Sequence, residues 1–101
     1  MEYELNMHFE ITHSLNKQSR TNEVIKMTAY QNKIILTYPS GYKLTGKPLL
    51  PSKSLGTIYE LDAFAGGDLT IDAKNNVIIN IYGSGVPIIS TSYGLIRKVN
   101  K

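Results

Sequence analysis

The chain has 101 residues, the length of one typical domain, and can bury a sizeable core without disulfide bonds or metal ions. Its hydrophobic fraction of 42% and charged fraction of 19% exclude a disordered chain, and the absence of cysteine fits a reducing compartment. Residues 1–10 lack the basic and apolar segments of a signal peptide, and apolar runs such as Ile34–Leu36 are too short to span a bilayer. We therefore expect one cytoplasmic β domain, residues 1–101, that does not contact membranes.

The first segment of the chain alternates polar and apolar residues without interruption. Tyr3, Leu5, Met7, Phe9 and Ile11 occupy every second position between polar neighbours. Strict alternation over ten residues predicts a strand, because successive side chains of a strand point to opposite faces of the sheet. We expect all five apolar side chains to lie on the buried face.

Further short strands are expected along the rest of the chain, separated by turn residues. The turns Tyr38–Gly41 and Lys74–Asn76 contain Pro, Gly and Asn, which favour tight reversals of the backbone. Residues 13–22 are polar and predict a loop, although a short helix within 14–30 is an alternative that would make the domain α+β. The expected strands after the first are Glu23–Tyr30, Lys33–Tyr38, Tyr42–Thr45, Thr57–Phe64, Asp68–Ala73, Val77–Tyr82, Pro87–Tyr93 and Leu95–Val99.

The sequence thus predicts an all-β fold of seven to nine short strands, either a small antiparallel barrel or a two-sheet sandwich. The segment Gly46–Gly56 interrupts the pattern and contains two prolines around Leu49 and Leu50. We expect these two leucines to cover an open end of the core. The alternative is a loop that contacts a partner.

Aromatic and basic residues are interleaved in the middle of the chain. Between Val24 and Tyr59 there are five lysines and no acid, and the net charge of the whole chain is +3. Aromatic rings flanked by cations are typical of small β domains that bind single-stranded nucleic acid or nucleotides. We expect an anionic partner here: a nucleotide-like small molecule, a nucleic acid or an acidic protein surface. The predicted ligand-binding residues are Tyr30, Lys33, Tyr38, Tyr42, Lys43 and Lys47, extended by Arg20, Arg97 and Lys98.

Catalytic and cofactor motifs are absent from the sequence. No serine lies in a nucleophile-elbow pattern, no zinc-ligand spacing occurs, and the glycine pairs near 66 and 84 match no phosphate-binding loop. His8 shares the polar face of the first strand with acidic residues, and we interpret this face as solvated. Asp68 and Asp72 could act as a carboxylate pair or bind a hard cation.

The leading hypothesis is therefore a non-enzymatic binding module of accessory or inhibitory type. The richness in Asn, Ile, Lys and Tyr, which AT-rich codons encode, is compatible with a phage or other viral origin. One alternative is an assembly protein that forms homo-oligomers through an open edge of the first strand. Another is a cation-dependent enzyme that uses Asp68 and Asp72.

Overall fold

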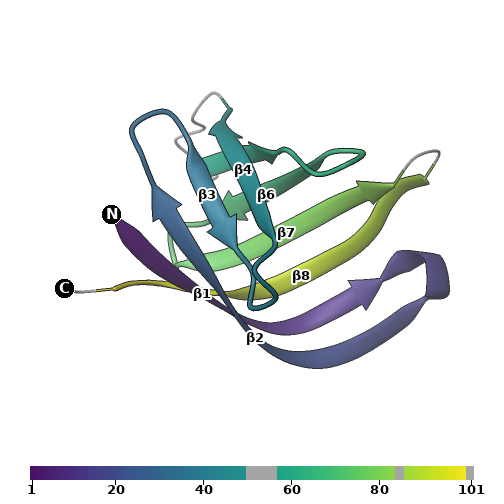
Figure 1. The fold of residues 1–101 in the computed structure, drawn as a ribbon. Helices are drawn as coiled ribbons and strands as arrows, with labels where there is room; N and C mark the ends of the chain where they lie inside the picture. Colours follow the sequence, from purple (N-terminus) through teal and green to yellow (C-terminus); the bar gives the residue numbers. More distant parts are fainter. Residues whose placement is uncertain (50–56, 84–85, 100–101) are drawn as a thin grey trace.

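The structure, a computed structural model, describes residues 1–49, 57–83 and 86–99. Eight antiparallel strands follow one another around a closed barrel, so the expectation of an all-β fold is confirmed, in its barrel form (Figure 1). The helix considered within 14–30 is not formed, apart from a single 3-10 turn, η1 (His13–Leu15). In the described ranges, no helix is long and apolar enough to cross a membrane. The strands are β1 (Glu2–Thr12), β2 (Lys17–Ala29), β3 (Ile34–Thr37), β4 (Lys43–Pro48), β5 (Thr57–Leu61), β6 (Gly67–Ile71), β7 (Asn76–Gly83) and β8 (Val86–Lys98).

The barrel closes where β1 pairs with β8. Leu5 of β1 lies opposite Ile25 of β2 on one side and opposite Ile96 of β8 on the other. The first strand therefore has a partner along both edges, and the open edge expected for self-association is not present. Both chain ends lie at one end of the barrel (Figure 1), where the Val99 amide donates to the Glu2 carbonyl at 2.9 Å.

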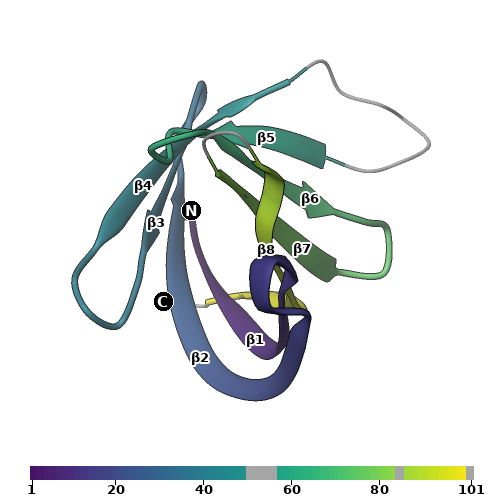
Figure 2. The same cartoon turned by 90° about the vertical axis from the view of Figure 1, so that its right-hand side faces the viewer.

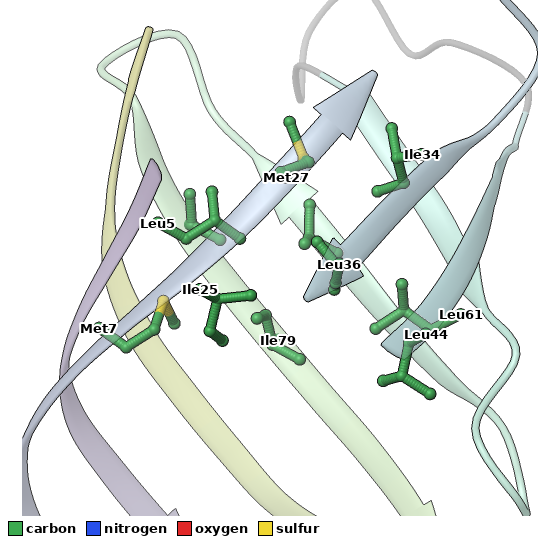
Figure 3. Close-up of a cluster of buried hydrophobic side chains, with 11 residues drawn as sticks. Leu5, Met7, Ile25, Met27, Ile34, Leu36, Leu44, Leu61 and Ile79 are labelled. Carbon is green, nitrogen blue, oxygen red and sulfur yellow. The ribbon is translucent and has the colours of Figure 1, made fainter. Parts of the chain in front are cut away.

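The barrel interior is filled by apolar side chains from seven of its strands (Figure 3). Full burial of one leucine or isoleucine side chain is worth about 1.5–3 kcal/mol, so this cluster dominates the stability of the fold. Because the middle of the barrel is occupied, a ligand would have to bind at an end of the barrel or on its outer wall. The buried residues are Leu5, Met7, Ile25, Met27, Ile34, Leu36, Leu44, Leu61, Leu69, Val77 and Ile79.

A β-bulge in β1 changes which side chains face the core. The pairing of β1 with both neighbours shifts register between Met7 and Phe9. Against β8, where Met7 lies opposite Gly94 and Phe9 opposite Tyr93, His8 is one extra residue, whereas β2 has two residues opposite His8. Because side chains alternate with period two, an inserted residue moves every later side chain to the opposite face. Tyr3, Leu5 and Met7 point inward, but Phe9 and Ile11 lie on the outer wall. The expectation that all five share the buried face is wrong for these last two.

Beyond the bulge, β1 and β2 continue together as a curved hairpin arm (Figure 2), in which residues 9–12 of β1 remain paired with residues 90–93 of β8. Residues 17–22, expected to be a loop, form the first part of β2, and residues 17–20 pair with residues 9–12. Their side chains lack apolar alternation because this part of β2 has no face on the core. The arm consists of Phe9–Thr12, η1 and Lys17–Asn22.

Other boundaries differ more modestly from the sequence prediction. β8 runs without a break through Gly94, where we expected two strands. β5 and β6 end at Leu61 and Ile71, before the predicted ends at Phe64 and Ala73, and residues 46–48 extend β4. The Leu49 side chain is 44% exposed and does not cover the core. Leu50 lies outside the described residues.

Candidate functional site

A groove lies on the outer wall of the barrel, between the arm and the strands β7 and β8. This groove has a volume of about 910 Å³. The bulge creates its floor, because Phe9 and Ile11 point outward only on account of the extra residue at His8. The side of the groove on the arm carries Arg20 and Thr21, and the β6–β7 turn contributes Asp72 and Asn76 at its far end.

The floor of the groove is apolar and aromatic. The rings of Phe9 and Tyr93 face each other across β1 and β8, with centroids 6.1 Å apart and planes tilted by 47°. Ile78 lies opposite Tyr93 on β7, and Ile11 lies on the next row of β1. These half-buried side chains form a continuous apolar floor across three strands.

Two exposed apolar residues extend this surface along the barrel wall. Val24 and Leu95 both lie opposite Asn6 in the register and are 40% and 49% exposed. Exposed apolar side chains that gather on one face of a protein are a feature of interaction sites. We refer to Phe9, Ile11, Val24, Ile78, Tyr93 and Leu95 together as the outer apolar patch.

The polar groups at the rim of the groove differ in whether they are already satisfied. One Asp72 carboxylate oxygen accepts bonds from the Lys74 and Asn76 amides at 2.8 and 2.9 Å, and the other accepts from the Asn76 side chain at 2.9 Å. Its bonds with Asn76 are the main reason that the pKa of Asp72 lies below its usual value. By contrast, Arg20 and His8 have no hydrogen bond or ion pair with the residues that the structure describes. The side chains left free to bind a partner therefore include the guanidinium of Arg20, which is a permanent cation with N–H donors only.

A chain of hydrogen bonds anchors the arm to the barrel wall. Thr91 is buried, donates to Asn80 Oδ1 at 2.7 Å, and lies 2.8 Å from His13 Nε2. Since the Thr91 hydroxyl proton points to Asn80, His13 acts as the donor to Thr91. Asn80 in turn donates to Asp68 Oδ1 at 3.0 Å. These hydrogen bonds connect the arm to a carboxylate on β6. They hold the arm, and therefore one wall of the groove, in a fixed position.

Tyr82 completes this network by donating its hydroxyl proton to the other oxygen of Asp68. The hydrogen bond to Asp68 is the main cause that raises the pKa of Tyr82, followed by burial. Both Asp68 oxygens thus accept protein hydrogen bonds, as do both oxygens of Asp72. Within the described ranges, no group of three or more His, Asp or Glu side chains could hold a metal ion.

The predicted tyrosine and lysine cluster is divided between the two ends of β3. At one end, the Lys33 Nζ lies 5.5 Å from the centre of the Tyr30 ring. At the other end, Tyr38 and Tyr42 pack with ring centroids 5.9 Å apart. Burial, with smaller contributions from Glu23, Tyr42 and Glu10, raises the pKa of Tyr38 to about 12. Sequence neighbours that we expected to form one surface therefore belong to two separate aromatic pairs.

The remaining predicted residues also lie apart from one another. Lys43 is exposed on the outer wall, and Lys47 lies opposite the acidic Glu60. Arg97 pairs with Glu4, its Nε 2.9 Å from the carboxylate, while Lys98 lies opposite Tyr3 at one end of the barrel. Of the nine predicted residues, Arg20 alone lines the groove. Phe9 and Ile11 were missed because their alternation was assigned to the core, and no local signal marks the bulge at His8. Ile78 and Tyr93 were not singled out by the sequence.

Comparisons with protein-family models, with curated proteins and with solved structures found no match. The candidate site therefore rests on the geometry of the groove.

Proposed function

We propose that this protein is a non-enzymatic binding module, of accessory or inhibitory type, that recognises an acidic segment of a partner protein in the outer groove. The observation that carries the proposal is the combination of an apolar floor with unsatisfied donors at its rim. A partner segment with an apolar or aromatic side chain would cover Phe9 and Tyr93. A neighbouring carboxylate would accept hydrogen bonds from Arg20, whose planar guanidinium suits bidentate carboxylate recognition.

The shape of the floor favours a protein partner over a nucleic acid. The Phe9 and Tyr93 rings are tilted against each other and lie beside isoleucines, a surface that suits aliphatic and aromatic side chains. Nucleic-acid binding on small β domains depends on bases stacked along a track of cations. Lys33, Lys43 and Lys47 are not arranged as such a track beside the groove.

The anchored arm supports the same proposal. A groove wall that is held in place by hydrogen bonds loses little conformational entropy when a partner binds, which favours affinity. The bonds from His13 through Thr91 and Asn80 to Asp68 give the arm this fixed position. The binding surface is thus preorganised along its length.

Selection from a displayed library of random peptides tests the proposal directly. With the unmodified protein, we expect enrichment of peptides that combine an apolar or aromatic residue with an adjacent Asp or Glu. With the charge-reversed Arg20→Glu variant, the preferred neighbour should become Lys or Arg. Lys43→Glu is the matched control, because Lys43 is equally exposed but lies outside the groove, and it should leave the consensus unchanged.

The selected peptides also allow the surface to be located. Their addition should shift the amide resonances of residues in and around Phe9, Ile78 and Tyr93, and Tyr93→Ala should weaken binding about tenfold or more, as for an aromatic residue at the centre of an interface. The proposal is wrong if Arg20→Glu selects the same acidic peptides as the unmodified protein, or if the shifts lie elsewhere on the barrel.

A further inference from the structure

A second hollow lies at the end of the barrel that holds both chain termini (Figure 1). Its volume is about 330 Å³, and its walls include Tyr3, Met27, Tyr59, Ile71, Ile96 and Lys98. The strand register explains why a lysine belongs to this set. Lys98 lies directly opposite Tyr3, and directly opposite residues of an antiparallel pair share one face of the sheet. Since Tyr3 packs against the core, Lys98 is placed on the inner face at the opening of the barrel.

Part of the lining of this terminal pocket is apolar. Met27 belongs to the buried core, and Ile71 and Ile96 pack against it from two other strands. The end of a barrel is a common position for small-ligand pockets, which have volumes of roughly 300–1,000 Å³. At about 330 Å³, the pocket would accept a single ring or a short hydrocarbon chain.

Besides Tyr3, Asn75 and Arg97, the polar side chains of the pocket include two donors without partners. Lys98 and the Tyr59 hydroxyl have no hydrogen bond or ion pair with any residue in the described ranges. Lys98 differs in this from its neighbour Arg97, which pairs with Glu4. Burial, and then the nearby Tyr3, raise the pKa of Tyr59, so its hydroxyl keeps its proton at neutral pH and can donate. An apolar pocket that offers an ammonium group and a phenol O–H is complementary to an apolar anion.

We propose that the terminal pocket binds a small monocarboxylate, with the carboxylate on Lys98 and Tyr59 and the hydrocarbon part on Met27, Ile71 and Ile96. This site is independent of the outer groove, from which it is separated by the barrel wall. A carboxylate fits better than a neutral or cationic molecule, because it alone satisfies both donors while the ring or chain displaces water from the apolar walls.

The test uses three probes with the same ring and different head groups: benzoate, benzyl alcohol and benzylamine. In nitrogen-15 amide spectra, benzoate should cause saturable shifts at Tyr3, Met27, Tyr59, Ile71 and Lys98, with benzyl alcohol weaker and benzylamine weakest. Lys98→Gln should weaken benzoate binding about tenfold, the loss expected for one charge-assisted hydrogen bond. Tyr59→Phe should weaken it by a smaller factor, whereas Lys43→Gln, on the outer wall, should leave it unchanged.

The results separate this proposal from the one for the outer groove. Arg20→Glu should not alter benzoate binding, and Lys98→Gln should not alter the consensus of selected peptides. The terminal-pocket proposal is overturned if benzylamine binds as tightly as benzoate, if Lys98→Gln binds benzoate with unchanged affinity, or if benzoate causes no saturable shift. Shifts confined to residues around Phe9 and Tyr93 would equally overturn it, since they would place the anion in the groove.

Discussion

Replacement of Gly94 by alanine should destabilise the barrel strongly, because the backbone of β1 leaves no room for a side chain at this residue of β8. Gly94 lies opposite Met7, next to the bulge. A Cβ atom at Gly94 would lie 2.5 Å from the Asn6 carbonyl oxygen, 2.6 Å from Met7 Sδ and 2.8 Å from Met7 Cα. Two of these three atoms belong to the backbone, so β1 itself would have to move.

The size of the effect can be worked from these contacts. Overpacking typically costs about 1–3 kcal/mol, and the backbone contacts place Gly94→Ala at the upper end, about 3 kcal/mol. Alanine also lowers the entropy of the unfolded chain, which stabilises the folded state by roughly 0.5 kcal/mol, so the net loss in the free energy of unfolding is about 2.5 kcal/mol. For a domain of this size, that corresponds to a fall in melting temperature of roughly 10–20 °C.

Equilibrium unfolding in urea measures this loss, with Gly41→Ala as the control. Gly41 has φ +92°, and no atom lies within 4 Å of the position that its Cβ would take, so the alanine variant experiences backbone strain without a steric clash. Its net loss should be about 1 kcal/mol. If Gly94→Ala loses no more stability than Gly41→Ala, β8 does not approach β1 as closely as these distances require.

Three further substitutions test the hydrogen bonds and the titrating groups. Thr91→Val removes the hydroxyl between His13 and Asn80 and should lower the free energy of unfolding by about 1–3 kcal/mol. Amide exchange in η1 should become faster, and an unchanged exchange rate would show that Thr91 does not anchor the arm. Folding lowers the pKa of Asp72, so the contribution of this carboxylate to stability is present above pH 3.8, its ordinary pKa, and is lost as the pH falls through the lower folded pKa. Asp72→Asn, which can retain the turn, should flatten this acid dependence in thermal melts. Burial raises the pKa of Tyr38 to about 12, so the stability of the protein should fall as the pH rises from about 10 to about 12. Tyr38→Phe should abolish the share of this loss that Tyr38 causes. An equal alkaline loss of stability in both proteins would contradict the assignment.

The sequence was sufficient to predict the fold class and several turns, because these depend on local preferences. Gly41 at φ +92° and Asn75 at φ 66° occupy the left-handed conformations that the predicted turns require. The alternation of apolar residues also identified the inward-facing side chains of these strands, such as Leu5 and Met7. Both signals arise from neighbouring residues, which a sequence shows directly.

The candidate site could not be predicted in the same way, because it depends on an inserted residue and on long-range contacts. Phe9 and Ile11 continue the alternation of β1 perfectly, and only the pairing with β8 shows that His8 is an extra residue. The bonds that join His13 to Thr91 likewise connect residues 78 positions apart. The expected tyrosine cluster was divided for a related reason, since Tyr30 and Tyr38 lie at opposite ends of one short strand.

The closure of the barrel by β1 and β8 has a consequence for the synthesis of the protein. Each other pair of neighbouring strands is adjacent in the chain, whereas Tyr3 and Lys98 are brought together from positions 95 residues apart. Such a non-local pairing carries a large loop-closure entropy and forms slowly. While the nascent chain grows, β1 can pair with β2, but its other edge has no native partner until β8 has emerged from the ribosome. During that interval the edge of β1 and the apolar face of Leu5 and Met7 are accessible to other chains, so fast translation of β8 would protect the protein from aggregation.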